Sequence, residues 1–136
     1  MHIFYFHHIG VAVKNIEMAK KKYSLLGYKP GKNISVPSQS VNVCFLEKAD
    51  EPCIELIEPI SEKSPVNSML KKVGSGPYHI CYLVNDIQES LEYLRTQGFV
   101  ILGKLVKSSA FNNNLMFFAY SNNFGYIEII NSEGVK

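Results

Sequence analysis

The stretch HHIGVAVKNI, residues 7–16, returns in altered form as YHICYLVNDI, residues 78–87. The two stretches stay in register when the chain is aligned with itself at an offset of 71 residues. The identical positions include His8 with His79, Ile9 with Ile80, Val13 with Val84, Ile16 with Ile87, and Gly27 with Gly98. So many matches at one unbroken offset, a glycine among them, indicate an internal repeat.

Each copy has the pattern of one strand, one helix and three further strands. HIGVAV and HICYLV are apolar runs of strand length. Asn15 and Asp86 follow these runs at positions typical of helix N-caps. Gly27 and Gly98 come where a left-handed residue commonly ends a helix. The later strand-like runs are YKPGKNI, VNVCFL and CIELIEP in the first copy, and FVILGKLV, NLMFFAY and YIEIIN in the second.

The sequence therefore predicts an α+β chain built from two βαβββ modules. We expect the first module in residues 1–60, a connector in residues 61–76 and the second module in residues 77–133. In the connector, Ser64 is expected to cap a short helix whose first turn contains Pro65.

Each half also carries one histidine on its first strand and one glutamate on its last. Glu55 follows His8 by 47 residues, and Glu128 follows His79 by 49. Taken singly, each histidine fits a packed core position and each glutamate fits a half-exposed strand. If the halves pack about a pseudo-twofold axis, all four side chains converge. Two imidazoles and two carboxylates suit one divalent ion such as Zn, Co, Ni, Mn or Fe.

The chain resembles the vicinal oxygen chelate superfamily, which has the glyoxalase I and bleomycin-resistance fold. HHIGVAV, IELIEP followed by SPV, YHICYLVNDI and YIEI are most similar to its methylmalonyl-CoA epimerase branch. The resemblance implies a cupped mixed sheet with helices outside, formed by the two modules around one metal ion. The family's four ligand positions fall, in order, on His8, Glu55, His79 and Glu128.

Such a site favours proton transfer next to a carbonyl group, because a metal ion stabilises the developing enolate. Glu128 is the expected base and Glu55 the second base on the other side of the carbon. Epimerisation of an acyl-CoA is the leading prediction. A glyoxalase I-type lyase is disfavoured, since Ala12 stands where that enzyme would need an arginine. Another isomerase or lyase of the superfamily, a bleomycin-resistance-type binding protein and a metal-free structural module are the alternatives.

The substrate pocket is expected between the modules. Its predicted lining residues are Val43, Phe45, Tyr78, Met116 and Phe118. An ordinary core role explains each of these residues at least as well. The region from Ser108 to Tyr120 departs from the epimerase pattern, because its glycines are replaced and a Pro-Lys pair is missing.

Composition limits the partners of the chain. Its 136 residues carry a net charge of +2 without the basic stripe that nucleic acid requires. No apolar stretch reaches transmembrane length, and the N-terminus lacks the features of a signal peptide. The three cysteines have no metal-type spacing and are typical of buried free thiols in a reduced compartment. We therefore expect a cytoplasmic homodimer that binds a small molecule, possibly an acyl-CoA, and neither nucleic acid nor membrane.

Overall fold

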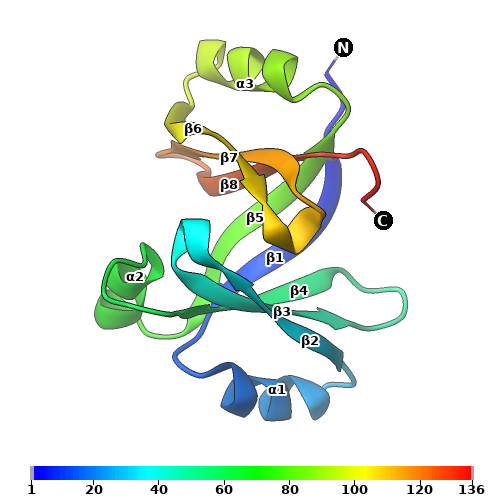
Figure 1. The fold of residues 1–136 in the computed structure, drawn as a ribbon, viewed down its shortest axis with the longest axis vertical. Coiled ribbons are helices and arrows are strands. Elements are labelled where there is room, and N and C mark those ends of the chain that lie inside the picture. Colours follow the sequence, from blue (N-terminus) through cyan, green and yellow to red (C-terminus); the bar gives the residue numbers. More distant parts are fainter. Residues whose placement is uncertain (1, 136) are drawn as a thin grey trace. The chain divides into compact units, whose positions relative to one another are not determined.

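A computed structural model describes residues 2–135 of the chain (Figure 1). These residues form two compact units. The first unit consists of residues 8–78, and the second combines residues 79–135 with the N-terminal residues 2–7. Within the described residues, no helix has both the length and the apolar character needed to cross a membrane.

The first unit contains a four-stranded sheet whose strand order is β2-β3-β4-β1. β1 runs parallel to β4, and the other neighbouring strands are antiparallel. Helix α1 packs against β2 and β4 (Figure 1). The elements of this part of the chain are β1 (Tyr5–Ala12), α1 (Ile16–Ser24), β2 (Lys29–Val36), the 3-10 helix η1 (Pro37–Gln39), β3 (Val41–Glu47), β4 (Cys53–Pro59) and α2 (Val66–Lys72).

The second unit repeats this arrangement with the strand order β5-β8-β7-β6. β5 runs parallel to β8, the other pairs are antiparallel, and helix α3 packs against β6, β7 and β8 (Figure 1). Its elements are β5 (Gly76–Val84), α3 (Ile87–Thr96), β6 (Val100–Ser108), the 3-10 helix η2 (Ser109–Phe111), β7 (Asn114–Ser121) and β8 (Gly125–Asn131). The predicted α+β class with two βαβββ modules is confirmed.

Both main helices begin and end as their sequences predict. Asn15 accepts a hydrogen bond from the Met18 N–H at 2.9 Å, and Asp86 caps α3 in the same way. Gly27 and Gly98 follow the helices with φ angles of 96° and 93°, which only glycine adopts without strain. Each helix is therefore fixed at both ends by its own sequence.

The predicted cap of the connecting helix is wrong. Helix α2 begins at Val66 with Pro65 at the N-cap, and no side chain caps it. Ser64 lies one position too early for its hydroxyl to serve the first turn, and its backbone carbonyl accepts the Asn67 N–H at 3.2 Å instead. Its buried hydroxyl has no hydrogen-bond partner among residues 2–135.

Each unit has a hydrophobic core between its helix and one face of its sheet. In the first unit this core includes Val11, Val13 and Ile16, and in the second it includes Val84 and Phe117. Strand side chains alternate, so β1 contributes Ile9 and Val11 to the core. The opposite face of each sheet is left for His8 and its counterparts.

Candidate functional site

The first unit holds a buried histidine–glutamate pair. His8 on β1 is completely buried, and Glu55 on the neighbouring strand β4 is only 4% exposed. Nε2 of His8 lies 3.1 Å from Oε1 of Glu55. In the parallel register, Glu55 stands opposite Gly10, two residues beyond His8. The two side chains therefore share one face of the sheet and meet across the strands.

The second unit repeats this pair with the same stagger and the same separation. His79 on β5 and Glu128 on β8 are 4% and 2% exposed, and their Nε2 and Oε1 atoms again lie 3.1 Å apart. Glu128 stands opposite Cys81, two residues beyond His79. The stagger between histidine and glutamate is therefore identical in the two units, while the residue that faces the glutamate changes from glycine to cysteine.

A phenylalanine accompanies each pair. Phe45 on β3 stands directly opposite Glu55, and its ring meets the His8 ring edge-on with centroids 5.5 Å apart. Phe118 on β7 stands opposite Glu128. Its ring contacts the His79 ring at the same centroid distance of 5.5 Å. Both phenylalanines are half-buried and are therefore more exposed than the histidine and glutamate that they accompany.

The chemistry of these pairs fits a metal ion. Burying a carboxylate is costly unless it is paired or binds a cation. Each unit offers one imidazole nitrogen and one carboxylate oxygen, which are donor types that divalent transition ions accept. The same carboxylates are also the groups that proton transfer requires.

The other predicted pocket residues lie around these pairs in different ways. Val43 and Met116 are buried, and each precedes its phenylalanine by two positions on the same strand face. Tyr78 precedes His79 on β5, so alternation directs its side chain to the other face of the strand. The place of all three residues in a substrate pocket stays a prediction.

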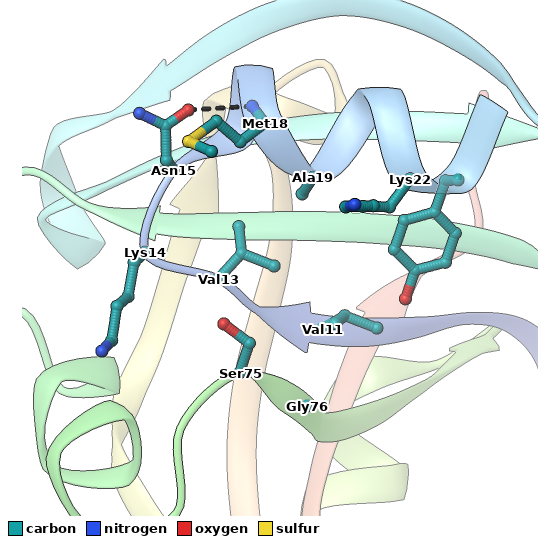
Figure 2. Close-up of a pocket in the computed structure, with 10 residues that line it drawn as sticks. Val11, Val13, Lys14, Asn15, Met18, Ala19, Lys22, Ser75 and Gly76 are labelled. Carbon is teal, nitrogen blue, oxygen red and sulfur yellow. Dashed lines mark hydrogen bonds between the residues drawn. The ribbon is translucent and has the colours of Figure 1, made fainter. Parts of the chain in front are cut away.

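A separate groove of about 370 Å³ lies on the opposite face of β1 (Figure 2). Val11 and Val13 form its floor, and the first turns of α1 form its wall. The ammonium groups of Lys14 and Lys22 border the groove and form no ion pair within residues 2–135. Because alternation places His8 on the other side of the strand, the groove is not part of the first pair's surroundings.

The model of a known protein family matches residues 7–120 of the chain. The chain belongs to the glyoxalase/bleomycin resistance protein/dioxygenase superfamily. The match covers the first repeat from His7 onward and the second repeat as far as Tyr120. It confirms the resemblance expected from the repeated motifs. Enzymes of this superfamily typically bind a divalent metal ion.

Two sequence relatives define the chain's place in the superfamily more closely. An uncharacterized Bacillus subtilis protein, YqjC, is 35% identical over 81% of this chain and 79% of its own length. An ethylmalonyl-CoA/methylmalonyl-CoA epimerase of Cereibacter sphaeroides is 35% identical over 71% of this chain and 72% of its own length. The chain is therefore epimerase-like, and the predicted isomerase class is confirmed.

Solved structures support the fold over nearly the whole chain. A methylmalonyl-CoA epimerase in complex with methylmalonyl-CoA and NH4+ matches 98% of this chain and 98% of its own with a TM-score of 0.83. Its sequence identity is 21%, so this likeness concerns the fold alone.

Proposed function

We propose that the chain is a metal-dependent acyl-CoA epimerase whose four ligands are His8, Glu55, His79 and Glu128. The observation that carries the proposal is the duplicated buried pair, with the same 3.1 Å separation of Nε2 and Oε1 in each unit. One pair supplies two donors, and a divalent transition ion requires at least four ligands. Two matched pairs would together supply four ligands to one ion, whose positive charge would offset the buried carboxylate charge.

A divalent ion held by these four residues would supply Lewis-acid polarisation of the thioester carbonyl group. Glu128 removes the proton from the carbon next to that carbonyl, and the electron pair of the broken C–H bond passes into the enolate. Glu55, which starts this direction of the reaction protonated, delivers its proton to the opposite face of the same carbon, which inverts its configuration. Proton exchange with water then returns Glu128 to the carboxylate and Glu55 to the acid. No electrons are gained or lost overall. Burial strengthens the electrostatic interactions on which both steps depend.

The relatives support the choice of substrate class. Those with an assigned activity act on methylmalonyl-CoA or ethylmalonyl-CoA, according to their names. A 2-substituted acyl-CoA is therefore the first substrate to test. The identity of the native metal ion, a homodimeric assembly and a cytoplasmic location stay predictions.

Proton exchange with solvent tests the proposal directly. Protein loaded with Co²⁺ is incubated with methylmalonyl-CoA in heavy water, and the signal of the α-proton is followed by NMR. We expect the natural protein to lose that signal rapidly. In Glu128→Gln we expect the exchange rate to be at least about 100-fold lower, which is the low end of typical acid–base contributions. Glu58→Gln is the matched control, since Glu58 lies on β4 with Glu55 but accepts the Ile16 N–H at 2.8 Å.

The outcomes separate the parts of the proposal. Retained exchange in Glu128→Gln with metal still bound would rule out Glu128 as the base. Absence of exchange in natural protein that holds one metal ion per chain would reject this acyl-CoA as substrate. Equal losses in Glu128→Gln and Glu58→Gln would mean that the effect is structural and would count against a specific role for Glu128.

A further inference from the structure

We infer that Phe45 and Phe118 are positioning residues that fix the orientation of the two histidine rings. The inference rests on the proposed function, because it concerns how His8 and His79 present Nε2 to the metal ion. It assigns the two phenylalanines a role in metal binding rather than in contact with substrate.

The first argument is the order of the strands. In the first unit β4 lies between β3 and β1, so Glu55 stands between Phe45 and His8. Strands two apart in a sheet are separated by roughly 10 Å. The rings of Phe45 and His8 nevertheless meet, with centroids 5.5 Å apart and planes inclined by 79°. The two side chains must therefore lean toward each other over the glutamate.

The second unit reproduces the arrangement with different neighbouring residues. Phe118, Glu128 and His79 occupy β7, β8 and β5, which are adjacent in that order. The rings of Phe118 and His79 lie 5.5 Å apart and are inclined by 73°. Both copies of the repeat therefore keep this contact, with the same centroid distance and the same edge-on geometry.

The physical effect of each contact is restriction of the histidine ring. Rotation about the terminal torsion of histidine is broad and only roughly two-fold in preference, so packing must select one orientation. Edge-on aromatic pairs have a preferred geometry beyond simple burial of area. Each phenylalanine therefore restrains the imidazole in the orientation that brings Nε2 to 3.1 Å from the carboxylate oxygen.

Cobalt binding tests this role without requiring catalysis. The Co²⁺ affinity and the visible absorption spectrum are measured for the natural protein and for Phe45→Leu and Phe118→Leu. Supporting residues around metal ligands typically change affinity by 10–100-fold, so we expect at least about 10-fold weaker binding. A shift of the cobalt absorption bands would report altered ligand geometry, which a general loss of stability does not produce.

Matched controls lie on the same strand faces. Val43→Ala and Met116→Leu alter buried residues two positions from the phenylalanines, opposite Ile57 and Ile130 rather than opposite a glutamate. We expect both to keep the natural affinity and spectrum. Phe45→Tyr, which retains the ring, is expected to keep them as well. If a leucine variant does not fold, the methionine variant at the same position is measured in its place, because methionine also lacks a ring but keeps apolar volume.

The possible results distinguish this inference from the proposed function. Natural affinity and spectrum in folded Phe45→Leu and Phe118→Leu would overturn the inference alone. Equal weakening by Val43→Ala and Met116→Leu would overturn it too, because any change in the core would then suffice. Failure of the natural protein to bind Co²⁺ would overturn the proposed metal site and this inference with it.

Discussion

Metal binding should raise the thermal stability of the natural protein, and loss of either histidine should abolish that rise. The perturbation is His8→Ala or His79→Ala, each of which removes one imidazole that lies 3.1 Å from its glutamate. The proposed metal ion would bind the folded chain through ligands that the unfolded chain does not hold together. Its binding free energy therefore adds to the free energy of unfolding.

The size of the rise in Tm follows from the free energy that metal binding adds and from the entropy of unfolding. A ligand at one hundred times its dissociation constant stabilises the folded state by about 2.7 kcal/mol. Unfolding entropy is about 2.1 cal/mol/K per residue, which amounts to about 0.29 kcal/mol/K for 136 residues. The quotient of these two values predicts an increase in Tm of about 9 °C for the natural protein.

Differential scanning fluorimetry with a Co²⁺ titration measures this increase against each variant's own metal-free midpoint. His2→Ala is the control, because the His2 ring stacks on Tyr93 with centroids 3.9 Å apart and belongs to no candidate metal-binding group among the described residues. We expect the full rise in His2→Ala and almost none in His8→Ala or His79→Ala. The reasoning is refuted if His8→Ala keeps the rise, or if the natural protein shows none at saturating metal.

Further predictions concern stability. Asn15→Ala and Asp86→Ala each remove a helix cap and should lower the free energy of unfolding by about 1 kcal/mol in urea titrations. Phe117→Ala empties a fully buried position and should cost about 3–5 kcal/mol in the same assay, whereas a loss below about 1 kcal/mol would contradict the observed burial. Burial raises the pKa of the Cys53 thiol from 9.0 to about 11, so the folded chain keeps a proton that the unfolded chain releases between these pH values. The free energy of unfolding should therefore fall as pH rises from 9 to 11, and Cys53→Ser should reduce that slope.

Much of the fold was predictable because its determinants are local. Helix caps act within four residues, and Asn15, Asp86, Gly27 and Gly98 all perform the roles that their positions indicate. Strand β4 begins and ends where the apolar run CIELIEP does. The prediction for Ser64 was wrong because a serine–proline pair allows the helix to begin at either of two neighbouring residues. Helix α2 begins one residue later than predicted, with Pro65 at the N-cap.

The residues of the candidate site were predictable, but their contacts were not. Repetition identified the two histidines and two glutamates, and strand alternation gave the face on which they lie. The contact of Phe45 with His8 depends on β4 lying between β3 and β1, which the local sequence does not encode. Phe45 and Phe118 consequently entered the prediction only as pocket lining.

The second half is longer than the first, but its additional residues lie where they do not alter the histidine–glutamate pair. His79 and Glu128 are separated by two residues more than His8 and Glu55, yet both pairs keep the same stagger and distance. A one-residue slip in either parallel register would turn the glutamate to the helix side of its sheet.

The two additional residues of the second half lie away from this register. One lengthens the irregularity in β6 around Gly103, and the other lies in the turn before β7, where Asn112 and Asn113 both adopt left-handed φ angles. Asparagine tolerates that conformation, so the region from Ser108 to Tyr120 takes up its one additional residue without glycine and without moving Glu128 out of register.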